Sequence, residues 1–426
     1  MPRQRFETFA ALRHRNFRLF FSGQFVSLIG SWMQSTALSW LVLELTNSAF
    51  YLGLVGALQT LPVLFLSFYG GVLADRTDKR WFLFITQCAM MLLALVLGVL
   101  VAEGAIRIWL ICFLGFMAGG VMAFDIPVRQ SFIVEMVGKP DLPNAIALNS
   151  TLFNATRVMG PAVAGMLIAW VGMANCFFIN AASFVAVLVA LALMQLPRHS
   201  ANHRMPVKEA LGELAVFVRS RRELLLILSV MTAMAVLAMP FMVLLPLLAR
   251  DFMGAGPQGF GVLMSASGLG AFLGGLALAR RLRLKPPMPS FLGGLVLFLL
   301  ALLGLAWCRN YNLALGLLFL AGFGMVTHIS TGNSLLQLNV PDELRGRVMS
   351  LFGLIIMGFS PLGNLLYGAA AHWAGPSLAI TAGVLLTGLT AGLILLRYPE
   401  LFSLDYAELR APASPAISQV PSDYRQ

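Results

Sequence analysis

Long stretches without a single charged residue constrain this chain more than any other feature. They cover residues 19–43, 45–74, 81–102, 108–124, 158–197, 224–249, 252–279, 286–308, 310–341 and 348–396. A helix needs about 20 apolar residues to cross the hydrocarbon layer of a bilayer, which is roughly 30 Å thick. The chain is also 59% hydrophobic and only 11% charged. These features predict a polytopic membrane protein and exclude a soluble enzyme, a secreted disulfide scaffold and a coiled coil.

The uncharged stretches divide into twelve predicted membrane-spanning helices. The two longest contain turns at 171–173 and at Gly375-Pro376, and residues 142–156 continue through Arg157 into a further helix. We therefore expect an all-α integral membrane fold with spans at 17–43, 50–74, 81–102, 108–126, 144–170, 175–196, 224–249, 258–279, 288–308, 311–333, 347–371 and 377–397.

The positions of the basic residues predict the orientation in the membrane. Cytoplasmic loops of membrane proteins carry an excess of Lys and Arg. With a cytoplasmic N-terminus, the inner segments hold all but four of the 29 Lys and Arg residues, and the exceptions are Arg107, Arg157, Arg250 and Arg309. Both termini are then cytoplasmic. The net charge of +11 thus indicates topology and contact with anionic lipid, and we expect no nucleic-acid partner.

The longest polar segment divides the chain into two halves. Val207, Leu211, Leu214 and Val218 recur in it at helical spacing, which predicts an interfacial amphipathic helix, with a plain solvated linker as the alternative. The order we expect is a cytoplasmic segment at 1–16, a six-helix half at 17–196, the cytoplasmic linker at 197–223, a six-helix half at 224–397 and a disordered cytoplasmic tail at 398–426.

An internal repeat supports this division. Lys139-Pro140-Asp141-Leu142 before the fifth predicted span recurs as Val340-Pro341-Asp342-Glu343-Leu344 before the eleventh. Two six-helix halves with a shared plan are typical of transporters built from parallel repeats.

Arg157 is the charged residue that we place near the middle of a span. A guanidinium is costly there and must face a cavity or a partner. Ser150, Asn154 and Pro161 share one helix face with Arg157. We expect Asn154 and Arg157 to contact an anion or substrate in a central cavity, or Arg157 to pair with a coupling acid. A purely structural ion pair, or a clamp on backbone carbonyls, is the alternative.

A second polar stripe lies on the first predicted span. Gln24, Ser27, Ser31 and Gln34 follow one another at helical spacing and share one face. We expect this stripe to line the path between the halves, and interhelical hydrogen bonds are the alternative.

Few titratable groups lie close to the apolar layer. Asp125 and Glu44 are at the ends of predicted spans, and His328 lies within the tenth. If transport is coupled to protons, Asp125, Glu44 and Asp75 are the acids that could carry them. His328 is a further candidate, although a lone membrane histidine is more often a hydrogen-bonded packing residue. Asp125 is preferred because Arg129 follows four residues later and Pro127 breaks the helix between them, although a local ion pair is nearly as good a reading.

Two motifs resemble those of a known family. Residues 71–80 resemble the loop signature of the major facilitator superfamily, and Gly160, Pro161, Ala164 and Gly165 resemble the antiporter motif of its exporters. The resemblance implies a conformational latch formed by Gly71, Asp75, Arg76, Lys79 and Arg80, and a mere topology anchor is the alternative. Asp78 stands where the family carries glycine.

The whole chain resembles the bacterial branch of this superfamily that exports drugs and siderophores. The resemblance implies a secondary transporter of the inner membrane, not an enzyme, that exports a small organic compound in exchange for protons by alternating access. An uptake symporter, a lipid-flipping protein and a non-transporting membrane protein of the same fold are the alternatives. No motif for ATP binding or hydrolysis is found, and we expect a monomer without metal or cofactor.

Overall fold

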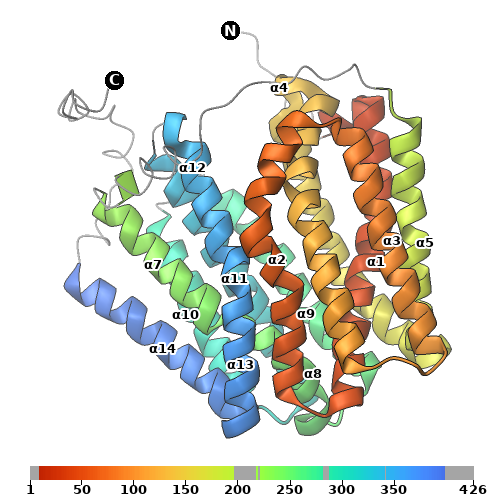
Figure 1. Ribbon diagram of the computed structural model, residues 1–426. Coiled ribbons are helices and arrows are strands. Elements are labelled where there is room, and N and C mark those ends of the chain that lie inside the picture. The colour runs from red at the N-terminus through yellow and green to blue at the C-terminus, as the bar shows by residue number, and fades with distance from the viewer. Residues whose placement is uncertain (1–8, 196–216, 219–220, 282–286, 341, 399–426) are drawn as a thin grey trace.

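The computed structural model describes residues 9–195, 217–218, 221–281, 287–340 and 342–398, and the side chains at 68, 71–76, 280, 342 and 343 are outside this description. The regular secondary structure of this described part is helical throughout (Figure 1). Its elements are η1 (Ala10–Arg13), α1 (Arg15–Thr46), α2 (Ala49–Arg76), α3 (Lys79–Ala102), α4 (Ile108–Val171), α5 (Met173–Leu193), α7 (Arg222–Leu237), η2 (Met239–Leu244), α8 (Leu245–Leu247), η3 (Leu248–Phe252), α9 (Pro257–Arg281), α10 (Met288–Trp307), α11 (Tyr311–Leu338), α12 (Asp342–Gly353), η4 (Leu354–Gly358), α13 (Ser360–Ala374) and α14 (Pro376–Arg397).

Eleven helical segments of the described part are long and apolar enough to cross a membrane. Large apolar side chains also cover the outside of the molecule, and Trp170, Trp373 and Leu396 are each more than three-quarters exposed. Such an exposed apolar surface fits lipid and not water. The predicted turns before the sixth and the twelfth span are present, because Gly172 and Gly375 have left-handed φ angles of 84° and 85°.

Helix α4 contains two of the predicted spans, at 108–126 and 144–170. Its 64 residues would form a rod of about 96 Å if they were straight, about three times the thickness of the hydrocarbon layer. The chain breaks instead at Gly138, where φ is 71° and ψ is 173°, a conformation open to glycine alone. We call residues 108–137 the first arm and residues 139–171 the second arm of α4.

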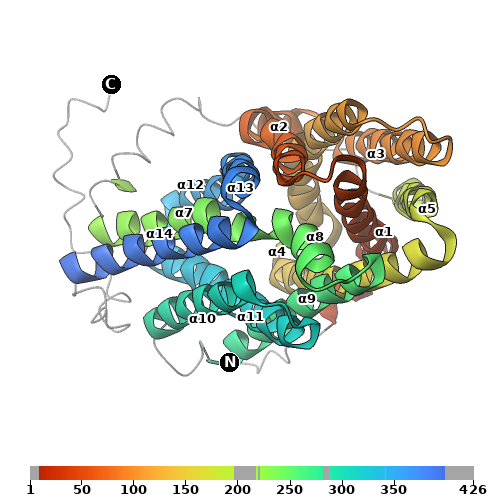
Figure 2. The ribbon, with the colours of Figure 1, turned by 90° about the horizontal axis from the view of Figure 1, so that it is seen from below.

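The two halves of the chain lie side by side (Figure 2). Helices α1, α2, α3 and α5 gather on one side and α7, α10, α11 and α14 on the other, with α4 and α9 at the junction. Two seams join the halves: α2 packs on α13, and the second arm of α4 packs on α9. We name the two ends of the molecule after Gly138 and Gly172, which lie at opposite ends of the second arm.

Two segments of the second half depart from regular α-helix. Between Arg222 and Phe252 the chain passes through a 3₁₀ segment and ends in a π-helical turn, with Pro240 and Pro246 in the irregular part. A second π-helical turn, η4, precedes Pro361 at the start of α13. Proline removes a backbone donor and clashes with the preceding turn, which explains these interruptions.

Several predictions concern residues outside the described part. The amphipathic helix of the linker, apart from Val218, and the tail from 399 onward lie there, as do residues 1–8. The segment boundaries at these places therefore remain predictions.

Candidate functional site

Both seams close through direct glycine contacts toward the Gly172 end. On the first seam, a Cβ atom on Gly53 would lie 2.7 Å from the Gly368 Cα atom. On the second seam, a Cβ atom on Gly261 would lie 3.0 Å from the Gly165 Cα atom. Real Cβ atoms require more room than this, so only glycine permits the helices to approach so closely. The two halves are thus in backbone contact at this end.

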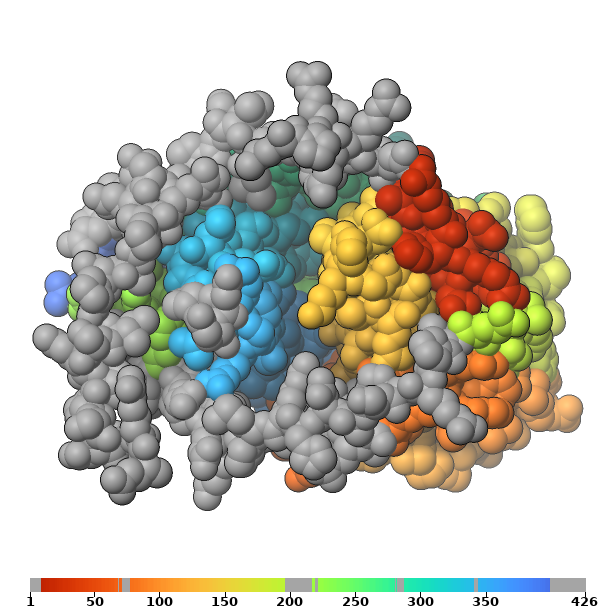
Figure 3. Space-filling view, turned by 90° about the horizontal axis from the view of Figure 1, so that it is seen from above, coloured from red at the N-terminus to blue at the C-terminus, as the bar shows by residue number. Residues whose placement is uncertain are grey.

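The same face of the second arm opens toward the Gly138 end. Near Gly172 this face is buried between the halves, with Ala164 completely inaccessible. About three to five turns from Ala164 toward Gly138 it becomes accessible, since Phe153 and Ile146 are 44% and 51% exposed. Arg157 lies between these regions and is half-buried. Figure 3, which looks onto the Gly138 end, shows a hollow between the yellow atoms of α4 and the blue atoms of α12. We call this hollow the cleft.

Arg157 lies between the buried and the accessible part of this face of the second arm, beside residues of both halves. Its guanidinium carbon is 5.9 Å from the centre of the Trp32 ring on α1, and Trp32 meets Phe153 edge to face at 5.5 Å. On the other side, the Ser265 hydroxyl of α9 donates a hydrogen bond to the Val158 carbonyl (2.7 Å). Asn154, one turn away, donates to the Ser150 carbonyl (2.8 Å) and remains half-accessible. The predicted stripe on this helix therefore faces the cleft.

The antiporter-like residues form the seal next to Arg157. Gly160 packs against the Cβ atom of Trp32 and the backbone of α1. The Pro161 carbonyl contacts Gly261, and Gly165 lies against the Gln258 backbone. The motif thus allows the second arm to touch α1 and α9 at once.

The polar stripe of α1 lies elsewhere. Gln24 and Ser27 are buried, and the side-chain Oε1 atom of Gln24 accepts a hydrogen bond from Arg129 of the first arm. Gln34 accepts from Asn180 of α5 (2.7 Å), and Ser31 donates to the Ser27 carbonyl (2.9 Å). In this structure Gln24 and Gln34 make interhelical hydrogen bonds within the first half, which is the alternative that the sequence left open.

The opposite face of α1 turns away from α5. Gly30 packs on Asn180 and Ser183 of α5, and Trp32 and Ser35 are about half a helical turn away from it. Ser35 is exposed and Trp32 contacts Arg157. Sequence reasoning missed this face because Trp32 is apolar in character and is followed by Met33, so no polar periodicity marks it. Its one signal was the polar residue before it, Ser31.

Asp125 lies in a buried polar cluster of the first half. Its carboxylate accepts hydrogen bonds from Thr86 (2.7 Å) and Gln87 (2.8 Å) of α3 and from Arg129 Nε (2.9 Å). Arg129 also pairs with Asp125 through Nη2 and donates to Gln24. Asp125 is 4% exposed, so its ion pair with Arg129 is buried. Such a pair is stable only when hydrogen bonds satisfy its other atoms, and here both carboxylate oxygens have hydrogen-bond donors.

The other coupling candidates lie apart from this cluster. Glu44, near the Gly172 end, is exposed and accepts a hydrogen bond from Trp40 Nε1 (2.6 Å). His328 is fully buried; its Nδ1 is 2.8 Å from the Phe291 carbonyl, and its ring stacks on Phe291 at 4.0 Å. His328 Nε2 has no hydrogen-bond partner among the described residues.

The loop between α2 and α3 is held within the first half. Asp78 caps α3 by accepting from the amides of Arg80 (3.0 Å) and Trp81 (3.2 Å), which explains why this turn accepts Asp where the family carries glycine. Lys79 pairs with Glu135. Arg80 donates to the carbonyls of Leu191 (2.6 Å) and Ala192 (2.8 Å) at the end of α5. The side chains of the remaining latch residues, Gly71, Asp75 and Arg76, are outside the described part.

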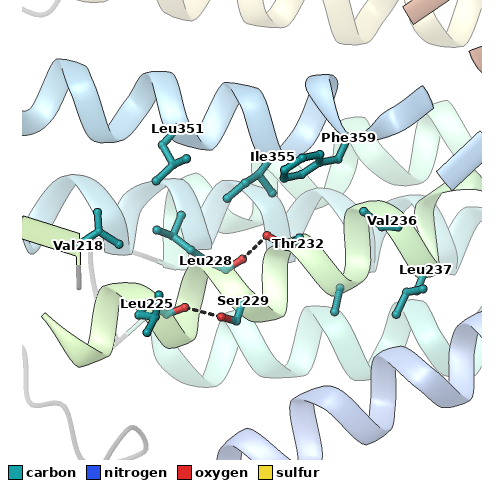
Figure 4. Close-up of a pocket in the computed structure, with 11 residues that line it drawn as sticks. Val218, Leu225, Leu228, Ser229, Thr232, Val236, Leu237, Leu351, Ile355 and Phe359 are labelled. Atoms are coloured by element: carbon teal, nitrogen blue, oxygen red, sulfur yellow. Dashed lines mark hydrogen bonds between the residues drawn. The ribbon is translucent and has the colours of Figure 1, made fainter. Parts of the chain in front are cut away.

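An apolar groove of about 570 Å³ separates α7 from α12, η4 and the start of α13 (Figure 4). Leu228, Thr232, Ile355 and Phe359 line its middle. The Thr232 hydroxyl donates to the carbonyl of Leu228 (2.8 Å) and is therefore not available to a ligand as a free donor. None of the predicted site residues lines this groove, so it is separate from the site around Arg157.

Comparison with known proteins identifies the family. Residues 6–420 match the family described as transmembrane secretion effector. The staphyloferrin A transporter of Staphylococcus aureus is 28% identical over 84% of this chain and 90% of its own length. The multidrug efflux pump Tap of Mycolicibacterium fortuitum is 28% identical over 89% and 94%, and the enterobactin exporter EntS of Escherichia coli is 25% identical over 90% and 92%.

Solved structures share the fold. A bacterial homologue of the human lysosomal transporter Spinster, inward-facing and unoccupied, superposes with a TM-score of 0.74 at 13% identity, covering 92% of this chain and 98% of its own. A bacterial homologue of the iron transporter ferroportin, also inward-facing, superposes with a TM-score of 0.62 at 16% identity, covering 89% and 98%. The chain therefore belongs to the transmembrane secretion effector family of the major facilitator superfamily, and is a multi-span transporter of the bacterial inner membrane.

Proposed function

We propose that this protein exports a small organic compound from the cytoplasm in exchange for protons, by alternating access. The observation that carries the proposal is the position of Arg157. It lies where the cleft between the halves ends and the glycine seal begins, near the middle of the second arm. A charged side chain at membrane depth is costly unless it faces water or a ligand, so this position supports a solute path.

The orientation that we propose places the Gly138 end in the cytoplasm. The two arms of α4 then count as separate spans, which gives twelve, and both termini are cytoplasmic. The distribution of Lys and Arg supports this orientation, because most basic residues flank the Gly138 end. The cleft described above is then an inward-open cleft, sealed toward the periplasm by Gly53, Gly368, Gly165 and Gly261.

For proton coupling we propose Asp125 as the group that gains and loses the proton. Its partner Arg129 is itself bonded to Gln24 of α1, so a change at Asp125 alters the contact between the first arm and α1. Glu44 is exposed and bonded to Trp40 of its own helix, and His328 is bonded to Phe291 of α10 within the second half. Neither of these hydrogen bonds joins the first arm to α1.

Named relatives support the export direction and the kind of solute. The enterobactin exporter, the multidrug efflux pump Tap and the staphyloferrin A transporter each match most of this chain. We therefore propose a drug-like or siderophore-like compound as the substrate. We propose that Asp75 is a latch between the halves. Its replacement should slow turnover and leave substrate binding intact.

The test is transport into inside-out membrane vesicles energised by respiration. A panel of labelled drugs and siderophores is offered with and without a proton ionophore, with the Asp125→Asn variant as a control. Ionophore-sensitive accumulation of a panel compound is the expected result. Accumulation in right-side-out vesicles instead would identify an uptake symporter. Transbilayer movement of labelled phospholipid by the purified protein, without solute transport, would identify a lipid-flipping protein.

A further inference from the structure

The positive charge of Arg157 is not balanced by a carboxylate in the described part of the chain. Ion pairs of the described part join other residues, such as His14 with Asp141, Lys79 with Glu135, Arg129 with Asp125 and Arg250 with Asp251. The Arg157 guanidinium carbon lies 5.9 Å from the centre of the Trp32 ring. A guanidinium at this depth without an acid partner carries an unbalanced positive charge, which an anionic ligand would neutralise.

Two of the three acids that sequence reasoning offered for coupling, Asp125 and Glu44, have other partners, and the side chain of the third, Asp75, is outside the described part. Asp125 accepts from Thr86, Gln87 and Arg129, and Glu44 accepts from Trp40. The ion-pair alternative for Arg157 is therefore not found with either Asp125 or Glu44. The site around Arg157 thus has net positive character, and it favours ligands of negative charge.

Aromatic rings flank the charge. Trp32 and Phe153 meet edge to face at 5.5 Å, and Phe153 is 44% exposed on the face of α4 that opens into the cleft. Flat ligands pack on exposed aromatic rings, and a guanidinium forms two parallel hydrogen bonds with a carboxylate. The site therefore offers one partner for an oxyanion and one for a flat apolar body, within a few ångströms of each other.

We propose that the solute carried through the cleft is an aromatic organic anion, with its oxyanion on Arg157 and its ring system against Phe153 and Trp32. The inference rests on the proposed function, because it names the substrate class of the same site. It makes a specific demand on the ligand: removal of the negative charge must weaken binding even when the shape is unchanged.

Binding of 2-naphthoate to the purified full chain in lipid nanodiscs tests the proposal, with the neutral 2-naphthamide as the matched probe. We expect 2-naphthoate to bind at least tenfold more tightly than 2-naphthamide. In Arg157→Gln the affinity for 2-naphthoate falls at least tenfold and that for 2-naphthamide is unchanged. Arg157→Lys keeps the charge and retains part of the preference, and Arg250→Gln, near the opposite end of the molecule from the cleft mouth, changes nothing.

A second variant tests the aromatic part. Phe153→Leu is expected to weaken 2-naphthoate binding severalfold while the preference for the anion over the amide remains. Equal affinity for the two probes, absence of 2-naphthoate binding, or an unchanged affinity in a folded Arg157→Gln protein would each overturn the proposal.

The outcome is separable from the proposed function. Arg157-dependent anion binding without proton-driven accumulation leaves this inference standing and removes the export function. Proton-driven export of neutral or cationic compounds that persists in Arg157→Gln would leave the export function standing and remove this inference.

Discussion

Gly368 and Gly53 touch through their backbones across the seam between α13 and α2: a Cβ atom on Gly368 would lie 2.8 Å from the Gly53 Cα atom, with the Ala49 and Phe50 carbonyls at 3.0 and 3.1 Å. Every one of these neighbours is backbone, which cannot rotate aside as a side chain can. The contact therefore makes the closure of this end sensitive to a single methyl group.

Gly368→Ala is expected to weaken the closed state of the Gly172 end by about 1–3 kcal/mol, the usual cost of overpacking. Double electron–electron resonance between spin labels at positions 51 and 373 would show a longer or broader distance distribution. Gly293→Ala on α10 is the matched control, because nothing lies within 4 Å of its Cβ position. An unchanged distribution in Gly368→Ala would contradict the role of this contact.

Gly138→Ala tests the break in α4. The backbone there has φ 71° and ψ 173°, and a side chain in this region costs about 1–3 kcal/mol. We expect a lower melting temperature in detergent. Gly120→Ala on the same helix has open space at its Cβ position and is expected to melt at the temperature of the original protein or above it. Equal melting of the two variants would argue against a strained turn at Gly138.

Asp125→Asn tests the proposed coupling group. The variant keeps the shape of the side chain but leaves the Arg129 charge without its counterion, so the proton site is lost. Proton-driven accumulation should fall to the level seen with ionophore, while exchange of labelled for unlabelled substrate across the vesicle membrane continues. If Asp125→Asn still accumulates substrate in a proton-dependent way, Asp125 is not the coupling group and another residue carries the proton.

Gln34→Leu separates packing from transport on α1. The substitution leaves Asn180 Nδ2 without the acceptor that now lies 2.7 Å away, and an unsatisfied buried donor costs about 1–3 kcal/mol. We expect a lower melting temperature and nearly normal transport per folded molecule. Loss of transport with an unchanged melting temperature would instead indicate that Gln34 lines the solute path, as the sequence suggested.

The helices themselves were predictable because each needs about 20 apolar residues, and charges mark their ends. The turns at Gly172 and Gly375 lie inside uncharged stretches, and glycine, with proline after Gly375, marked them instead. The direction in which a stripe faces was harder to predict. The stripe with Asn154 and Arg157 faces the cleft, whereas Gln24 and Gln34 bond to other helices of the first half. Both stripes have the same periodicity, and only the neighbouring helices decide which one meets solvent.

Contacts made by apolar or small residues were also hidden. Trp32 beside Arg157 and the groove between α7 and η4 both depend on residues far apart in sequence. The irregular backbone around Pro240 and at η4 also makes helix faces hard to predict. A π-helical or 3₁₀ turn shifts every following side chain around the helix axis.

Side-specific labelling of Ser150 tests most directly the claim that the cleft beside Arg157 opens to the cytoplasm. Ser150→Cys and, separately, Ala164→Cys would be introduced after Cys88, Cys112, Cys176 and Cys308 are replaced, and treated with a membrane-impermeant maleimide in the absence of substrate. Ser150 is exposed on the cleft face and Ala164 is completely buried in the seal. We predict labelling at position 150 in inside-out vesicles only, and none at position 164 in the same vesicles. Labelling at position 150 only from the periplasmic side, or equal labelling at both positions, would contradict the account.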